Sequence, residues 1–260
     1  MAISKSKALS GAAAHGAGLW TCRLILGIEL AFICASPART ALAAQAVPDV
    51  CVRVLVKEAG SPEVFYADPA RCDSLVDLLA SRCRERPDEL LELLDTPWAT
   101  HFEVLRRALE KAGAPAREAV IRKIGEAPPK AELSLLLAVF EKLGVRGDER
   151  YLEGAFRSGE PSVLVCAARC LASFGEGPGP VERLKPLFSQ SPAQVRLAAA
   201  WAAARVYERD PQERIARTLT EAIRPLLDDP IPLVRFTAAE TLRIVSGPEK
   251  GIPEPLYPGH

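Results

Sequence analysis

Two segments of the chain match each other without a gap, 39 residues apart: residues 183–206 and residues 222–245. Each has a proline near its start, then a Val-Arg pair, then two consecutive alanines. The matched pairs are Pro186 with Pro225, Val195 with Val234, Arg196 with Arg235, Ala199 with Ala238 and Ala200 with Ala239. Self-similarity at this period is typical of repeat proteins, in which each unit buries its apolar face against its neighbours.

Earlier copies of the pattern are fainter. Residues 151–171 repeat it 32 places before residues 183–203, and residues 131–144 and 100–113 resemble it more loosely. The glycines that close three of these units lie 31 residues apart and are Gly113, Gly144 and Gly175. We therefore expect about five units between residues 73 and 246.

The units read as helices. Val234, Ala238 and Leu242 recur at i, i+4 and i+8, which places them on one apolar stripe of a helix. Only 6% of the chain is aromatic, and alanine and leucine dominate from residue 70 onward, a mixture that favours packed helices over a β-sandwich. The sequence therefore predicts an all-α fold.

The pattern resembles the HEAT family of α-helical repeats, including its shorter bacterial variants. In that family, a first helix with a proline inside it precedes an Asp-Pro turn, and a second helix carries Val-Arg-x-x-Ala-Ala-x-x-Leu. The residues that fill these places are Pro186, Val195, Arg196, Ala199, Pro225, Asp229, Pro230, Val234, Arg235, Ala238 and Leu242. The resemblance covers residues 148–247 most specifically and implies a right-handed α-solenoid of about five HEAT-like helix pairs.

The resemblance also implies roles for individual residues. Pro186 and Pro225 would bend their first helices, while Arg196 and Arg235 would bridge to turn carboxylates such as Asp229 or Glu160 and so brace neighbouring repeats. A solenoid offers an extended concave surface to another protein. The candidate partner-binding residues, which lie off the apolar stripe of the second helices, are Arg169, Arg205, Glu240 and Arg243. The alternative for each is a solvated helix face.

The N-terminus indicates export. Residues 24–35 form a mostly apolar run that follows Arg23, and the helix-breaking Pro37 precedes an Ala-Leu-Ala site at residues 41–43. These are the three parts of a secretory signal peptide, so residues 1–43 are interpreted as one with an unusually long basic region. The mature protein is then periplasmic or extracellular, with no membrane span. The alternatives are a membrane anchor, or a misplaced start codon in a cytoplasmic regulator.

Residues 44–72 lie outside the repeat. Residues 50–56 alternate β-branched side chains and are expected to pair with residues 63–66 as a small hairpin, or to form an extended arm. A helix over residues 73–86 would begin with Asp73 as its N-cap. The last part, residues 247–260, is rich in proline and is expected to form an extended tail.

Five cysteines remain after removal of the signal peptide. Cys51, Cys72 and Cys83 lie where an oxidising compartment could supply one disulfide, although the sequence does not specify the pair. Cys166 and Cys170 are four residues apart on one expected helix, a spacing that suits disulfide geometry poorly. We interpret these two as small buried side chains.

The sequence offers little for catalysis or for binding nucleic acid. The only histidines are His15, His101 and His260, and no nucleophile motif or metal-ligand spacing accompanies them, so no enzyme, cofactor or metal is predicted. The 33 basic and 33 acidic residues leave no basic surplus for nucleic acid. We expect a protein–protein interaction scaffold whose partner is another protein. The alternatives are a lyase or transferase, since bilin lyases also use HEAT-like repeats, and a structural assembly subunit of the cell envelope.

Overall fold

The computed structural model describes residues 50–96 and 98–247. The predicted signal peptide and nearly all of the proline-rich tail lie outside this range. The chain divides into two compact units, Met1–Cys51 and Val52–His260, and the structure describes only the last two residues of the first. Within the described range every regular element is a helix, so the all-α prediction is confirmed.

The α-helices are α3 (Val50–Ala59), α4 (Pro62–Phe65), α5 (Pro69–Glu85), α6 (Pro87–Leu91), α7 (Ala99–Ala112), α8 (Ala114–Gly125), α9 (Lys130–Leu143), α10 (Glu153–Arg157), α11 (Pro161–Phe174), α12 (Pro178–Leu184), α13 (Ala193–Arg209), α14 (Glu213–Ile223) and α15 (Pro232–Ser246). Shorter 3₁₀ helices are η2 (Asp148–Leu152), η3 (Lys185–Ser189) and η4 (Arg224–Asp228).

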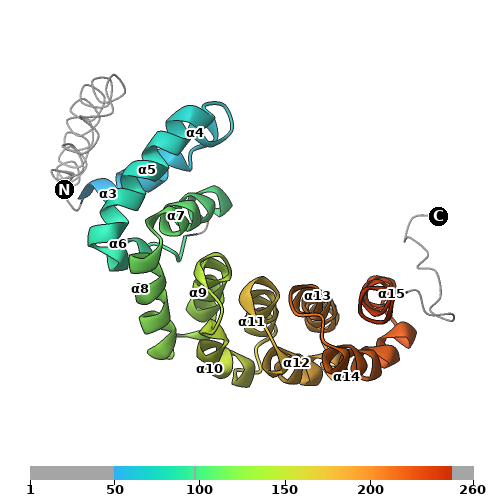
Figure 1. Ribbon diagram of the computed structural model, residues 1–260. Coiled ribbons are helices and arrows are strands. Elements are labelled where there is room, and N and C mark those ends of the chain that lie inside the picture. The colour runs from blue at the N-terminus through green and yellow to red at the C-terminus, as the bar shows by residue number, and fades with distance from the viewer. Residues whose placement is uncertain (1–49, 97, 248–260) are drawn as a thin grey trace, which may run out of the picture. The chain divides into compact units, whose positions relative to one another are not determined.

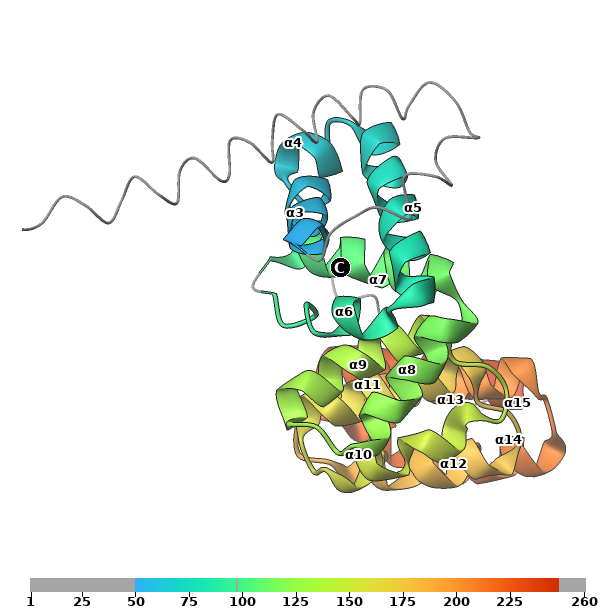
Figure 2. The same ribbon diagram turned by 90° about the vertical axis from the view of Figure 1, so that its left-hand side faces the viewer.

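The helices from α9 onward form two layers (Figures 1 and 2). In one layer, called here the long-helix row, α9, α11, α13 and α15 pack side by side in that order. The other layer, the short-helix row, consists of η2 with α10, α12 with η3, and α14 with η4. Each of its members packs against the long helix that follows it in the chain. Towards the N-terminus, α8 contacts α5, α6, α7 and α9 and thus connects the earlier helices to the row.

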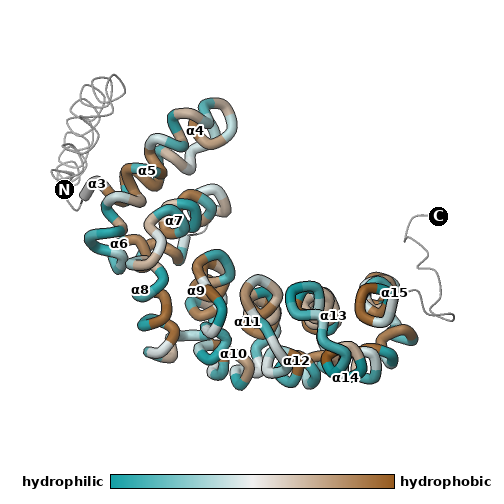
Figure 3. The backbone as a smooth tube through the Cα atoms, viewed as in Figure 1, coloured by the Kyte–Doolittle hydropathy of each residue, from teal (hydrophilic) through white to brown (hydrophobic). Residues whose placement is uncertain are grey.

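The core lies between the two layers and between neighbouring long helices. In α13 the buried positions Val195, Ala199, Ala202 and Val206 form one stripe, and all four are fully shielded from solvent. Alanine at the centre of such a stripe allows two helix backbones to approach closely. Hydrophobic and hydrophilic colours accordingly alternate along each helix of the row (Figure 3), as expected for helices with one buried side.

Prolines mark the point where two members of the short-helix row change their winding. Pro186 is the second residue of η3, which continues directly from α12, and Pro225 is the second residue of η4, which continues from α14. Proline cannot donate an i→i−4 hydrogen bond, and its ring displaces the preceding turn. The chain therefore passes from α-helix to the tighter 3₁₀ helix at both places.

The N-terminal hairpin prediction is wrong. Residues 50–59 form helix α3, and residues 62–65 form the short helix α4. Val52, Leu55, Val56 and Ala59 are all buried, and their spacing of three and four places them on one helical face. The alternating valines suggested a strand, but burial of this face outweighs the intrinsic β-preference of valine.

The expected N-cap at Asp73 is also wrong. Helix α5 begins four residues earlier at Pro69, and the side chain of Asp68 caps it by accepting a hydrogen bond of 3.1 Å from the amide of Arg71. Proline is favoured at the first position of a helix because its missing amide would have no partner there. Asp73 therefore lies inside α5 and contacts the neighbouring helix instead.

Four cysteines in the described range are free thiols. Cys72 and Cys83 lie three turns apart on α5, both buried, and therefore cannot bond to each other. On α11, Cys170 is buried while Cys166 is half-buried. Burial raises the pKa of Cys170 well above its ordinary value, because the thiolate would lose its hydration.

Candidate functional site

The long helices share a defined register. The thiol of Cys170 on α11 donates to the carbonyl of Leu137 on α9 at 3.3 Å. The hydroxyl of Thr241 on α15 donates to the carbonyl of Ala200 on α13 at 3.0 Å. These two bonds join equivalent positions in the sequence alignment of the repeats. Each fixes one long helix along its axis relative to the helix before it, so equivalent residues come into line along the row.

Equivalent residues define an outward face, the side of the long-helix row that the short-helix row does not cover. Arg169 on α11, Trp201 on α13 and Glu240 on α15 occupy the same repeat position on this face. Trp201 is 39% exposed. The guanidinium of Arg205, one turn further along α13, lies 5.8 Å from the centroid of the indole ring. A cation over an aromatic face at this separation is attracted by the ring quadrupole.

The four predicted partner-binding residues all lie on α11, α13 and α15. Arg169 is paired with Glu141 on α9 at 2.8 Å, and Arg205 with Glu208 at 2.8 Å. Glu240 and Arg243 pair with each other at 3.0 Å. The pairs within one helix are partly exposed, and such pairs contribute only about 0–1 kcal/mol to stability. These side chains can therefore exchange their present partners for others at small cost.

Sequence reasoning missed Trp201 as a member of this face. It stands within the run of alanines at residues 198–204, where small size suggested only a buried helix contact. A signal was present, because the buried pair at Ala199 and Ala200 places the next residue on the opposite side of the helix. Trp201 is thus the large exposed side chain of an otherwise small-residue helix.

A buried ion pair braces α13 to the unit that follows it. Arg196 donates to both carboxylate oxygens of Asp229, at 2.6 and 2.9 Å, and both side chains are largely buried. Its remaining Nη1 donates at 2.7 Å to the carbonyls of Gln190 and Ser191. The hydrogen bonds from Arg196 lower the pKa of Asp229, although burial acts in the opposite direction.

Arg235 differs from this arrangement. Its Nη1 donates to the carbonyls of Asp229 and Pro230, at 2.7 and 3.2 Å, which are the equivalents of the two carbonyls that Arg196 contacts. The expected bridge from Arg235 to a turn carboxylate is wrong for the part of the chain that the structure describes. The reason is positional, because α15 is the last described helix and no further turn follows it there.

A second buried brace was not foreseen. Arg117 on α8 forms a bidentate ion pair with Asp148 in η2, and its Nε lies 2.7 Å from the carboxylate. Asp148 is buried and also accepts a hydrogen bond of 2.9 Å from the amide of Val145. The Val-Arg pair that marks Arg196 is missing around Arg117, so the repeat alignment gave no signal there.

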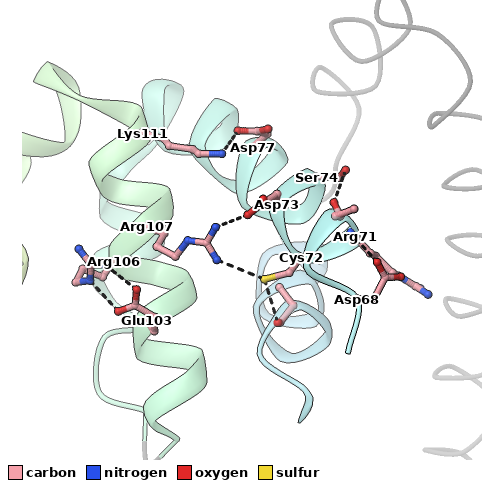
Figure 4. Close-up of polar contacts among 12 residues, drawn as sticks. Asp68, Arg71, Cys72, Asp73, Ser74, Asp77, Glu103, Arg106, Arg107 and Lys111 are labelled. Carbon is pink, nitrogen blue, oxygen red and sulfur yellow. Dashed lines mark hydrogen bonds and ion pairs between the residues drawn. The ribbon is translucent and has the colours of Figure 1, made fainter. Parts of the chain in front are cut away.

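Charged residues also join α5 to α7 (Figure 4). Arg107 pairs with Asp73, and Lys111 pairs with Asp77 at 2.6 Å, one turn further along both helices. Arg107 also approaches the sulfur of Cys72 at 3.7 Å. Burial raises the pKa of this thiol, and the nearby guanidinium only partly opposes the rise. The cluster therefore reads as a helix–helix contact.

His101 lies at the start of α7. Its Nδ1 is 3.5 Å from the hydroxyl of Thr96, and its ring lies against Gly60. Partial burial lowers the pKa of the imidazole, and the charge of Lys57 adds to this effect. Across residues 50–96 and 98–247 no three histidine, cysteine or carboxylate side chains gather in a way that could hold a metal ion.

A small hollow lies between α12 and α14. It encloses about 190 Å³ and is lined by Pro178, Val181, Glu182, Arg214, Ile215 and Thr218. Pockets that bury a drug-sized ligand are larger, about 300–1,000 Å³. Among the described helices, none is both long and apolar enough to cross a membrane.

Comparison of the chain with protein-family models, with curated proteins and with solved structures finds no match.

Proposed function

We propose that the protein is an exported, HEAT-like α-solenoid that binds another protein through the outward face of α11, α13 and α15. The proposed solenoid is right-handed and contains five helix pairs, in which α7, α9, α11, α13 and α15 are the second helices. Helices α3, α4 and α5 then precede the first pair. The recurring Cys170 and Thr241 contacts support this proposal, because each joins one long helix to the preceding one at the same repeat position.

One observation carries the binding role: a partly exposed tryptophan with an arginine over its ring, at the centre of a row of helices. Tryptophan and arginine are enriched among the residues that dominate protein–protein binding energy. Trp201 and Arg205 lie on the third of four long helices, with Arg169 on one side and Glu240 on the other. The face therefore combines a rigid apolar anchor with charged groups of both signs.

The binding role can be tested with a matched pair of tryptophan variants. The full chain is used as bait in the envelope fraction of the producing cell, beside Trp201→Ala and Trp98→Ala. Trp98 is also exposed but lies before α7, outside the outward face. Loss of an anchor residue costs at least about 2 kcal/mol, so Trp201→Ala should weaken a bound partner by roughly 30-fold. Trp98→Ala should retain it.

Two results would contradict the proposal. Equal retention by both variants would place the interface elsewhere on the molecule. A protein that captures no partner but carries a small ligand would favour the lyase or transferase alternative. Circular dichroism of each variant is measured first, so that loss of helix content is not mistaken for loss of binding.

Export is tested separately. Fractionation of the producing cell should place the protein outside the cytoplasm, and mass spectrometry of its N-terminus should show a chain that begins near residue 44. A full-length chain in the cytoplasmic fraction would contradict the signal-peptide interpretation.

A further inference from the structure

The last long helix lacks a contact that the helix before it makes. In Arg196, Nε and Nη2 form a fork that binds the carboxylate of Asp229 in the following unit. Arg235 is the equivalent residue in α15, is exposed, and uses Nη1 in the same way. Its Nε and Nη2 contact no carboxylate among the described residues. The fork that selects a carboxylate in one unit is therefore available in the next.

The same helix is more apolar on its exposed side than α13. Ile231, Leu233 and Ile244 are each between 40% and 47% exposed. At the equivalent positions, 39 residues earlier, the chain has Pro192, Gln194 and Arg205. Two of the three positions are thus polar in the internal unit and apolar in the last one. An apolar surface beside an open guanidinium fork suits a covering segment that has apolar residues and a carboxylate.

The chain itself continues with such a segment. Residues 248–260 contain five apolar or aromatic candidates for contact at prolines and at Ile252, Leu256 and Tyr257, and they contain two carboxylates, Glu249 and Glu254. Gly247 ends α15 with a φ of 72°, a left-handed conformation that lets a chain turn away from the helix axis. A segment that turns back there would run along α15 towards Arg235.

The lengths distinguish the two carboxylates. Arg235 lies twelve residues before Gly247, a distance of about 18 Å along the helix. A proline-rich segment rises about 3.1 Å per residue, so Glu254 lies about 22 Å from Gly247 and Glu249 only about 6 Å. Glu254 therefore reaches the level of Arg235, whereas Glu249 stays near the end of α15.

We propose that residues 248–260 fold back along α15 and close the end of the helix row, with Glu254 bound to the guanidinium fork of Arg235. Glu254 then takes the place that Asp229 takes for Arg196. Ile252 and Leu256, on either side of Glu254, cover part of the exposed apolar surface of α15. The tail substitutes for the next unit of the row.

The test compares two glutamate variants of the full chain by hydrogen–deuterium exchange. Glu254→Gln should increase exchange about tenfold in peptides from the first half of α15, because a charge-assisted bidentate contact is lost. Glu249→Gln should leave exchange unchanged. Deletion of residues 248–260 should produce at least the effect of Glu254→Gln. Arg235→Gln combined with Glu254→Gln should have no more effect than either change alone.

Each other outcome overturns the proposal. If Glu254→Gln behaves like Glu249→Gln, then Glu254 does not occupy the fork. If deletion of the tail leaves α15 equally protected, the tail does not cover it. Protection that rises with protein concentration and survives the deletion would show that a second copy of the chain covers α15 instead, and sedimentation would then detect the dimer.

Discussion

Replacing Asp229 with alanine tests the brace between α13 and the last unit. The change removes two hydrogen bonds from Arg196 and a third, of 2.9 Å, from the amide of Ile231. Removing one partner of a buried ion pair costs about 3–5 kcal/mol, because the other charge stays buried. Arg196 keeps its two carbonyl acceptors, so we expect the lower end, about 3 kcal/mol.

The loss should be local. In a row of repeats, stability is close to a sum of unit stabilities and nearest-neighbour contacts, so the weakened contact releases mainly α14 and α15. A loss of 3 kcal/mol corresponds to roughly a 100-fold increase in opening. Hydrogen exchange should therefore accelerate on that order in α14 and α15 and change little in α9.

The adjacent residue provides the control. Asp228 is exposed, and its replacement by alanine should change stability by less than about 0.5 kcal/mol. If the alanine variants of Asp229 and Asp228 accelerate exchange equally, the buried pair does not hold the unit, and the reasoning from burial fails.

The same pair predicts a pH dependence. Arg196 holds the pKa of Asp229 below its ordinary value, so the folded protein binds fewer protons than the unfolded chain in mild acid. The stabilisation is therefore complete above the ordinary carboxyl pKa and is lost as the pH falls through the lowered value. The stability difference between the native protein and Asp229→Asn, measured by urea unfolding, should shrink between pH 6 and pH 3. A constant difference would contradict this assignment.

Two further predictions concern packing and thiol chemistry. A Cβ at Gly144 would lie 2.2 Å from the buried ring of Phe174, so Gly144→Ala should destabilise the protein by about 1–3 kcal/mol. Gly154→Ala, where a Cβ meets nothing within 4 Å, should be neutral or slightly stabilising, and thermal unfolding compares the two. Burial raises the pKa of Cys83 to about 12, so alkylation at pH 8 should modify the half-buried Cys166 on the order of 100-fold faster. Peptide mass spectrometry measures both rates, and equal rates would mean that α5 opens readily.

The helical fold of the C-terminal half could be predicted because the pattern there is redundant. Proline, the Val-Arg pair and the alanine pair recur together at residues 186–200 and 225–239, and each has a local physical reason. The Arg196–Asp229 contact was among those that the family resemblance implied. It needs only that the two residues keep their repeat positions.

The N-terminal part could not be predicted in the same way. The valines of α3 satisfy a period of two as well as they satisfy a helical face, and only burial against the rest of the fold decides between them. Arg117 and Asp148 are far apart in sequence and belong to no motif. The exposure of Trp201 depends on which side of α13 faces the neighbouring helices, which local propensity does not determine.

The brace between Arg196 and Asp229 has a consequence for the growth of the chain. A unit cut from Ser191 to Asp229 carries both an arginine that reaches forward and an aspartate that reaches back. Tandem duplication of this segment would join the arginine of the first copy to the aspartate of the second. The row is thus extensible by whole units, since a single duplication supplies a matching junction without any new pair of residues.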